Sequence, residues 1–220
     1  MAEDIYLYIN VPFCLRRCNY CYCTLDFSDE DLLSYRDKSE LFVESTLKEI
    51  SAFSGGNKRC LGISFGGGTP SLLSLPQIER IFNAAMKCCA SVNKTAQINI
   101  EIFPGTKKRD ELRSLRSLGF NRASIGAQSF NDAELQLLGR AHNRDAIYKT
   151  HEDLLASGFD NINIDVMFGL PTGDLASWTK TVDSALSLRP KHLTAYYWFV
   201  ATRSDFFKKV KEGHRLGMKL

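Results

Sequence analysis

Three cysteines near the start of the chain have the spacing of an iron–sulfur ligand set. Cys14, Cys18 and Cys21 form a C-x3-C-x2-C run that directly follows an apolar segment, 5–11. Thiolates are the side chains that most often bind iron–sulfur clusters. Three thiolates leave one iron of a cubane cluster without a protein ligand, and that iron can bind and reduce a small molecule. The run therefore predicts redox chemistry on a molecule bound at the open iron.

Two other uses of the run are zinc binding and disulfide formation. Cys23 offers a fourth thiolate for zinc, but structural zinc sites usually combine two separated ligand pairs, and no second pair or H-x3-H follows. A disulfide set is disfavoured because Glu3 and Asp4 stand where a secretory signal has basic residues, and no apolar signal segment follows. Three further cysteines lie in apolar surroundings and are interpreted as core residues: Cys60, Cys88 and Cys89.

The composition is that of a soluble globular chain of about one domain, since 44% of the 220 residues are hydrophobic and 24% are charged. The net charge of +3 is too small to indicate nucleic-acid binding, and no apolar run has transmembrane length. Seven cysteines without a secretory signal indicate a reducing compartment. We therefore expect a location in the cytoplasm, with an organelle matrix as the alternative.

Short apolar runs alternate with helical patterns along the chain. The expected strands are 5–11, 61–65, 97–103, 122–126, 161–168 and 192–199, and the expected helices are 40–53, 75–90, 107–118, 145–156 and 175–188. Ser74 is a candidate N-cap with Pro76 in the first turn, and Gly119 and Gly158 each follow an expected helix end. Such an alternation indicates parallel βα units, either a doubly wound sheet or a partial barrel of six strands.

In both forms, ligands gather at the carboxyl ends of the strands, where the cysteine run falls. A glycine-rich turn, Gly66-Gly67-Gly68-Thr69-Pro70, follows the second strand. Its backbone can approach a ligand without interference from a Cβ atom, although a plain strand-to-helix turn is an equal alternative. It is not a phosphate loop, because no Gly-Lys-Ser/Thr follows.

Polar side chains also interrupt three apolar strands: Glu101, Gln128 and Asp165. Each could be a buried polar group with internal partners, but their equivalent positions in successive βα units indicate a shared ligand site. Carboxylates suit ribose hydroxyls and an ammonium group. Arg140 suits a carboxylate, which it can hold with two hydrogen bonds.

These motifs, in this order, resemble the radical S-adenosylmethionine superfamily. More narrowly, the chain is similar to the group that contains oxygen-independent coproporphyrinogen III oxidase, a related haem chaperone and the class C radical methyltransferases. The matching segments are 8–14, the cysteine run, 66–70, 128–131, 138–142 and 165–171, and the resemblance extends over about residues 5–200. It implies a partial (β/α)6 barrel of the TIM type with parallel strands.

The resemblance also implies roles for individual residues. Cys14, Cys18 and Cys21 would bind a [4Fe–4S] cluster, and S-adenosylmethionine would chelate the open iron and be cleaved to a 5′-deoxyadenosyl radical. Gly67, Gly68 and Thr69, in the turn that Gly66 begins, match the loop that binds the methionyl amine. Arg140 matches a carboxylate-binding arginine. Three residues match positions that face the adenosyl part: Glu101, Gln128 and Asp165.

The implied partners are an electron donor such as flavodoxin or ferredoxin and a small molecule that could be a tetrapyrrole, with haem as a further ligand in the chaperone alternative. The chain departs from the family pattern at Asn10, where histidine is common, which puts an oxidase-type substrate step in doubt. We expect a core domain over residues 1–200 and a short tail over 201–220, where the family's C-terminal domain would begin. The chain therefore looks truncated.

Four functions stay open from the sequence. The first is a radical enzyme linked to porphyrin or haem metabolism, an oxidoreductase resembling coproporphyrinogen dehydrogenase. The second is a haem chaperone without oxidase activity. The third is a class C radical methyltransferase, and the fourth is a cluster-bearing remnant without turnover.

Overall fold

The computed structural model describes residues 2–23, 26–27 and 32–213. Its centre is a parallel sheet of six strands: β1 (Glu3–Val11), β4 (Lys58–Gly67), β5 (Ser91–Ile102), β6 (Arg122–Gln128), β7 (Ile162–Phe168) and β8 (His192–Tyr197). Neighbouring strands follow one another in chain order, β1-β4-β5-β6-β7-β8. The order never reverses, so the sheet is a partial barrel and the doubly wound alternative is wrong.

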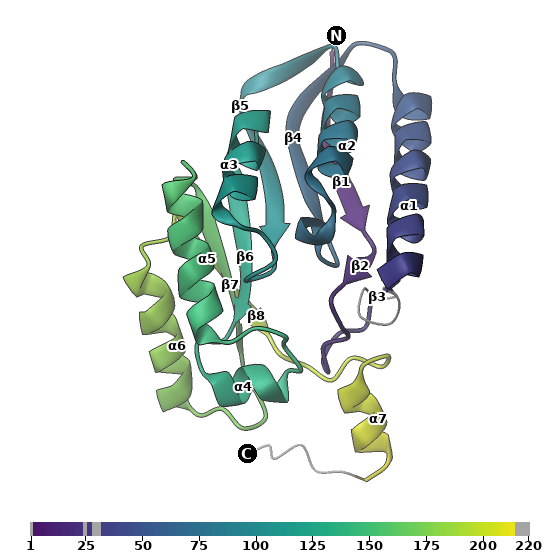
Figure 1. Ribbon diagram of the computed structural model, residues 1–220. Coiled ribbons are helices and arrows are strands. Elements are labelled where there is room, and N and C mark those ends of the chain that lie inside the picture. The colour runs from purple at the N-terminus through teal and green to yellow at the C-terminus, as the bar shows by residue number, and fades with distance from the viewer. Residues whose placement is uncertain (1, 24–25, 28–31, 214–220) are drawn as a thin grey trace.

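Five helices cover the outer face of this sheet: α1 (Leu32–Phe53), α2 (Leu75–Lys87), α3 (Arg109–Leu118), α5 (Arg144–Ala156) and α6 (Leu175–Ser187) (Figure 1). All six expected strands and all five expected helices are confirmed, several with longer bounds. Four short elements were not expected from the sequence: β2 (Phe13–Cys14), β3 (Asp26–Phe27), the 3-10 helix η1 (Pro70–Leu72) and α4 (Asp132–Leu137). Short elements carry too little periodicity to be recognised from sequence.

The two faces of the sheet differ in chemistry. Ile63, Phe65 and Ile100 are buried beneath the helices, as the outward positions of a βα barrel require. The inward positions are polar and hydrogen-bonded to one another across strands. Asn99 Nδ2 donates to Ser64 Oγ (3.1 Å), and Ser124 Oγ donates to Asn99 Oδ1 (3.0 Å). The interior of the barrel is therefore lined by a polar network and not by a hydrophobic core.

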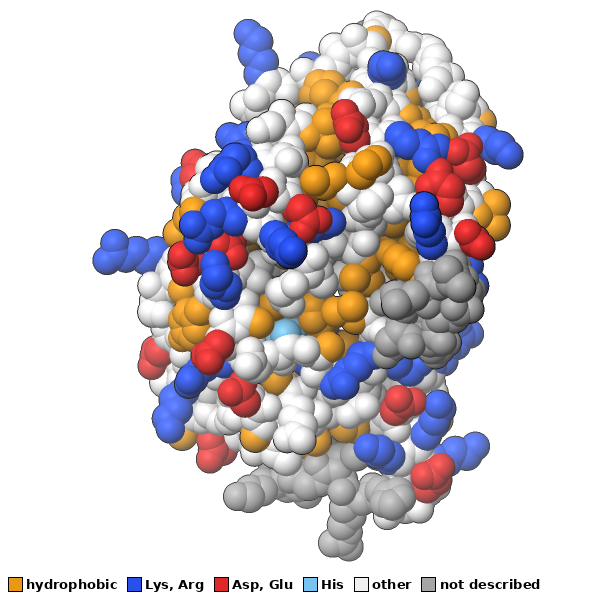
Figure 2. All heavy atoms as spheres, in the orientation of Figure 1, with side chains coloured by type: hydrophobic (Ala, Val, Ile, Leu, Met, Phe, Trp, Pro, Cys, Tyr) orange, Lys and Arg blue, Asp and Glu red, His pale blue; other side chains and the backbone are white. Residues whose placement is uncertain are grey.

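Ion pairs join neighbouring helices on the outer face. Arg80 of α2 pairs with Glu40 and Glu44 of α1, and Arg109 Nε of α3 lies 2.7 Å from Asp153 Oδ1 of α5. Figure 2 shows basic and acidic side chains interspersed over this face. The Arg80 pairs are about half exposed and therefore weakened by solvent, whereas the Asp153 side chain is only 10% exposed.

Local signals set the helix ends. Ser74 caps α2 in a capping box with Gln77, with Pro76 in the first turn, as expected. Gly119 and Gly158 follow the ends of α3 and α5 with positive φ, also as expected. Within the described residues, no helix is both long and apolar enough to span a membrane.

The interpretation of three cysteines as core residues is confirmed. Cys60 and Cys88 are buried, and Cys89 packs half-buried against the same core.

The C-terminal helix α7 (Asp205–Lys211) lies at the carboxyl end of the barrel (Figure 1). There the backbone N–H of Phe206 donates to the Asn19 carbonyl (3.0 Å), so the last described segment packs directly against the cysteine loop. The domain boundary expected at residue 200 stays a prediction.

Candidate functional site

A cavity of about 400 Å³ opens at the carboxyl ends of the strands. Its wall includes all three cysteines of the run and nearly all of the other residues singled out from the sequence: Cys14, Cys18, Cys21, Gly67, Gly68, Thr69, Glu101, Gln128, Arg140 and Asp165. Gly66 is the exception, although it lies next to Tyr8 and Glu101 of the wall. Segments more than a hundred residues apart in the chain thus meet around one space.

The cysteine loop is held against the glycine turn by main-chain hydrogen bonds. The N–H of Gly68 donates to the carbonyl of Val11 (2.8 Å), and that of Thr69 donates to the carbonyl of Phe13 (2.6 Å). Cys14 Sγ lies 3.3 Å from Thr69 Oγ1. These contacts place the first thiol of the run directly beside the glycine turn.

The thiols sit in surroundings that disfavour a free thiolate. Burial raises the pKa of Cys14, and burial raises the pKa of Cys21 to about 12. A bound metal cluster would reverse this, because thiols that coordinate a cation lose their protons. The donors therefore suit a positively charged group that is bound inside the cavity.

Among the residues that the structure describes, no three His, Cys, Asp or Glu side chains converge closely enough to hold one metal ion. A zinc ion needs its ligands around a single point. A cubane cluster has its irons at separate corners, so its ligands can stand further apart. Cys14, Cys18 and Cys21 lie around one cavity, a spread that cluster ligands can have, and the zinc alternative stays untested.

Two glycines of the turn lie close against neighbouring side chains. A Cβ atom on Gly66 would collide with the Tyr8 hydroxyl and the Glu101 carboxylate. Gly67 has a φ of +101°, and a Cβ there would meet Asn10 Oδ1. Asn10, the residue that departs from the family pattern, therefore lies against the glycine turn. Gly66 lies next to it in the same turn, close to Tyr8 and Glu101.

Two carboxyl groups face the same part of the cavity. Burial and the nearby charge of Asp165 raise the pKa of Glu101 to about 7. Burial also raises the pKa of Asp165, although Asn163 Nδ2 donates to its Oδ1 at 2.7 Å. Two buried acids that repel each other are stabilised by a cation placed between them. This pair therefore suits a ligand with an ammonium group or with hydroxyl donors.

Arg140 reaches the cavity from the loop after α4. Its Nη2 donates to the carbonyl of Gly126 (2.8 Å), and its Nη1 lies 3.5 Å from Cys18 Sγ and 3.4 Å from Tyr20 Oη. Its Nε is buried and has no hydrogen-bond partner within the described residues. A buried donor without an acceptor is costly, so this nitrogen is suited to a ligand oxygen.

Gln128 occupies an unusual backbone position at the end of β6. The strand pairing shifts register between Gly126 and Gln128, and Gln128 has a φ of +70°. Positive φ is uncommon for residues other than glycine and is found often at functional sites. The bulge brings the Gln128 side chain to the wall of the cavity.

A second, outer cavity of about 680 Å³ shares Phe103 and Arg140 with the first. Phe103 is packed on two sides. The guanidinium of Arg140 lies 4.2 Å from its ring centre, and the ring of His142 meets it edge-on at 4.9 Å. These three side chains form the wall between the two cavities.

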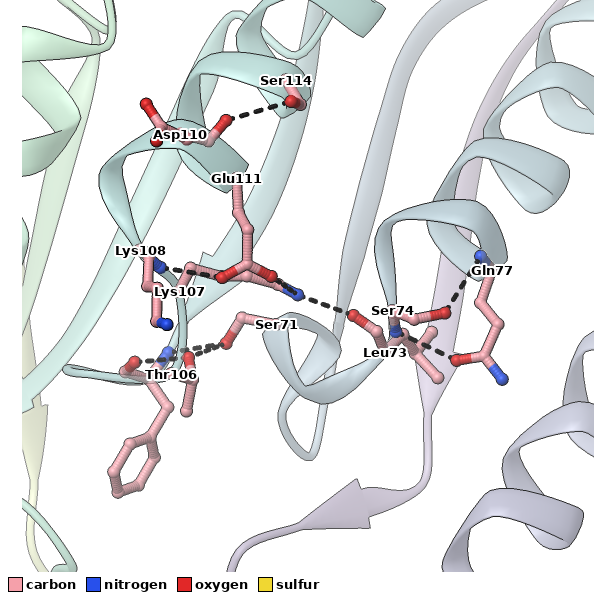
Figure 3. Close-up of polar contacts among 11 residues, drawn as sticks. Ser71, Leu73, Ser74, Gln77, Thr106, Lys107, Lys108, Asp110, Glu111 and Ser114 are labelled. Atoms are coloured by element: carbon pink, nitrogen blue, oxygen red, sulfur yellow. Dashed lines mark hydrogen bonds and ion pairs between the residues drawn. The ribbon is translucent and has the colours of Figure 1, made fainter.

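A buried lysine fixes this wall to the glycine turn (Figure 3). Lys107 Nζ donates to the carbonyl of Leu73 (2.9 Å) and to Glu111 Oε1 (2.9 Å). Next to it, Ser71 Oγ accepts from the N–H of Phe103 (3.1 Å). The contacts tie η1, which follows the turn, to the loop that carries Phe103.

The cavity has an aromatic rim that was not expected from the sequence. Its members are Tyr8, Tyr22, Tyr196, Tyr197 and Phe199, all with at least 49% of their surface exposed. The signal was present: aromatic residues at the ends of the first and last expected strands should meet where the barrel stays open. Exposed aromatics of this kind suit a planar or hydrophobic ligand.

The fold and this site define a class of protein. The sequence model of the Radical SAM superfamily matches residues 8–185, so the chain belongs to that superfamily. Membership implies a [4Fe–4S] cluster and S-adenosylmethionine as cofactors.

Two curated relatives from Synechocystis sp. are similar over 94% of this chain. One is named haem chaperone HemW, with 32% identity, and the match covers half of its length. The other is named oxygen-independent coproporphyrinogen III oxidase, with 28% identity, and the match covers 44% of its length. The solved structure of coproporphyrinogen III oxidase (HemN) from Escherichia coli matches with a TM-score of 0.82 and 28% identity, over 96% of this chain and 47% of that one. The chain thus spans about half the length of these relatives.

Proposed function

We propose that this chain binds a [4Fe–4S] cluster through Cys14, Cys18 and Cys21 and binds S-adenosylmethionine at the open iron. When bound and reduced, these groups supply a 5′-deoxyadenosyl radical. The observation that carries the proposal is the single cavity in which the three thiols face an unpartnered arginine nitrogen and two buried acids.

Each polar group has a matching part of the cofactor. Arg140 Nε would donate to the methionyl carboxylate, and the backbone at Gly67 and Gly68, with Thr69, would accept the methionyl amine. Glu101 and Asp165 would bind the ribose hydroxyls of the adenosyl part, with Gln128 beside them. Gly66 supports the turn from behind. The protein thus orients the cofactor and excludes water, while the radical chemistry belongs to the cofactor itself.

A link to tetrapyrroles is supported by the names of the relatives and by the aromatic rim. We infer a ligand of that class, either as a substrate for oxidation or as haem held for delivery. The chaperone alternative is favoured by a relative named haem chaperone with 32% identity. The oxidase alternative is favoured by the structural match to coproporphyrinogen III oxidase. The methyltransferase and the inactive remnant are further outcomes of the tests below.

The first experiment is anaerobic reconstitution with iron and sulfide, followed by electron paramagnetic resonance of the reduced protein with and without S-adenosylmethionine. We expect a cubane signal that changes when the cofactor is added, and formation of 5′-deoxyadenosine. Cys18→Ala should lose the signal, while the matched control Cys89→Ala, altered on the far side of the core, should keep it. A cluster whose signal does not change when S-adenosylmethionine is added would contradict the proposal.

A second experiment separates the functions. Methionine formation that depends on coproporphyrinogen III supports the oxidase, and methylation of a tetrapyrrole supports the methyltransferase. Stoichiometric haem binding followed by transfer to a haem-free acceptor, without such turnover, supports the chaperone. Cofactor binding with none of these activities indicates the remnant.

A further inference from the structure

Arg122 is a charged residue inside the barrel that the proposed cofactor site does not use. It begins β6 and stands beside Asn99 of β5 in the strand register. Its neighbours Ala123 and Ile125 are fully buried in the core under the helices. Because side chains alternate along a strand, Arg122 faces the inside of the barrel, as Ser124 does.

The guanidinium of Arg122 makes no hydrogen bond to the described residues. Within 2–23, 26–27 and 32–213 it forms no hydrogen bond and no ion pair, and its Nε is buried without an acceptor. A guanidinium carries several N–H donors in a fixed plane, and burying one without an acceptor costs free energy. Unsatisfied groups of this kind in a native fold require an explanation, such as a ligand.

The positive charge of Arg122 affects two residues that line the cavity. Burial raises the pKa values of Asp165 and Tyr196, and the positive charge of Arg122 opposes both shifts. Asp165 and Tyr196 both line the cavity. The guanidinium therefore lies close enough to this cavity for its charge to influence the ionisation of Asp165 and Tyr196.

Arg122 is not simply the salt-bridge partner of Asp165. The carboxylate of Asp165 accepts a hydrogen bond from Asn163 at 2.7 Å, whereas Arg122 donates none to it. Asn163 is in turn held by Thr194 Oγ1, which donates to Asn163 Oδ1 at 2.8 Å. The acid is thus satisfied by its own neighbours, and the N–H groups of Arg122 stay available.

A ligand can reach this region from the open side of the barrel. The edge strands β1 and β8 do not pair with each other, and their inward tyrosines are exposed: 75% for Tyr6 and 49% for Tyr196. Arg140 does not compete for the same group, because it lies at the carboxyl end of the sheet among Cys18, Tyr20 and Phe103. The barrel therefore holds two arginines at different depths.

We propose that Arg122 binds a carboxylate group of the substrate, deeper in the barrel than the cofactor. The planar fork of a guanidinium matches a carboxylate with two parallel hydrogen bonds. This inference rests on the proposed function, because it assumes that the barrel admits a substrate beside the cofactor. The substrate class is then a molecule with at least one free carboxylate, such as a tetrapyrrole that carries acidic side chains.

The first test needs no cluster and no tetrapyrrole. The side-chain Nε–Hε signal of Arg122 is assigned in the ¹⁵N-labelled full chain by its loss in Arg122→Lys, and the chain is titrated with succinate. We expect a saturable shift of this signal, and no shift with the neutral analogue succinamide. Inorganic phosphate at the same ionic strength tests the other common oxyanion. No shift with succinate, or an equal shift with phosphate, would overturn the carboxylate assignment.

The second test uses haem and its dimethyl ester, which differ only in their carboxylates. Arg122→Gln should weaken haem binding about tenfold, in line with the loss of one charged hydrogen-bonded pair, and leave binding of the ester unchanged. Arg113→Gln, on the exposed face of α3, is the matched control. Equal loss with both ligands would mean that Arg122 only supports the fold.

The two proposals can fail separately. Binding of S-adenosylmethionine to the reconstituted cluster should be the same in Arg122→Gln as in the unaltered chain. If the unaltered chain fails to bind the cofactor while succinate still shifts the Arg122 signal, the proposed function is wrong and the carboxylate site stands.

Discussion

The guanidinium of Arg140 stacks on Phe103, with its central carbon 4.2 Å from the ring centre, while its Nη1 lies 3.5 Å from Cys18 Sγ. One arginine thus joins the wall of the barrel to the thiol of a proposed cluster ligand. The stacking fixes the plane of the guanidinium, and the plane determines where its unpartnered Nε can donate. The predictions that follow test this arrangement and the packing that supports it.

Arg140→Lys should weaken binding of S-adenosylmethionine by about 100-fold, because lysine keeps the charge but loses the planar fork and the stacking. Isothermal titration of the reconstituted protein measures the change. Iron and sulfide content should stay the same, since no cluster ligand is altered. Arg144→Lys, four positions further along the chain and largely exposed, should bind like the unaltered protein. Equal affinity in both variants would remove Arg140 from the cofactor site.

His142 should stay neutral throughout the stable pH range. Burial and the neighbouring charge of Arg140 lower its pKa to about 3, although its Nε2 lies 3.2 Å from the Ala127 carbonyl. The ring-proton NMR signals of His142 should therefore not move between pH 5 and pH 8, where an ordinary histidine titrates at about 6.5. Free N-acetylhistidine amide in the same buffers serves as the titrating comparison. A His142 midpoint near 6.5 would contradict the packed wall.

The sequence predicted the six-stranded sheet well because apolar runs that alternate with amphipathic helices leave few other solutions. It also brought together the residues that line the cavity, since the carboxyl ends of parallel strands meet at one edge. It could not predict how Arg140, Phe103 and His142 stack, because such contacts depend on loop geometry. In the sequence Arg122 is only the first residue of an expected strand, and its lack of a hydrogen bond to the described residues appears only in three dimensions.

Glu101→Gln should stabilise the protein at neutral and alkaline pH. The pKa of Glu101 is raised from 4.5 to about 7, so the folded state favours the protonated acid. Its contribution to stability is complete below pH 4.5 and is lost as the pH rises through 7. The variant should therefore unfold at about the same urea concentration as the unaltered protein at pH 4 and be more stable by roughly 1–3 kcal/mol at pH 8. If the difference in unfolding free energy between the two proteins were the same at pH 4 and pH 8, the raised pKa of Glu101 would be refuted.

Lys107→Ala should destabilise the fold by about 1–3 kcal/mol, since it leaves the Leu73 carbonyl without its donor and removes the partner of the partly exposed Glu111 carboxylate. The side chain of Lys107 is only 4% exposed, whereas that of Glu111 is 34% exposed. Glu111→Gln should therefore cost less, because the amide keeps a hydrogen-bond acceptor for Lys107. Urea unfolding at pH 7 gives both values. A smaller loss for Lys107→Ala than for Glu111→Gln would show that the lysine is not the centre of the contact in Figure 3.

Gly66→Ala should abolish cofactor binding without altering any proposed ligand. Its new methyl group would occupy the space of the Tyr8 hydroxyl and the Glu101 carboxylate, so one of these side chains or the glycine turn has to move. Because Thr69 of the same turn lies 3.3 Å from Cys14 Sγ, a displaced turn also disturbs the first thiol. Gly173→Ala is the matched control, since a Cβ there meets only ordinary contacts of 3.4 Å. Both variants should show a cooperative unfolding transition, but only Gly66→Ala should fail to perturb its cluster spectrum when S-adenosylmethionine is added. A normal cofactor response in Gly66→Ala would mean that the turn tolerates a side chain and that its glycines serve the fold alone.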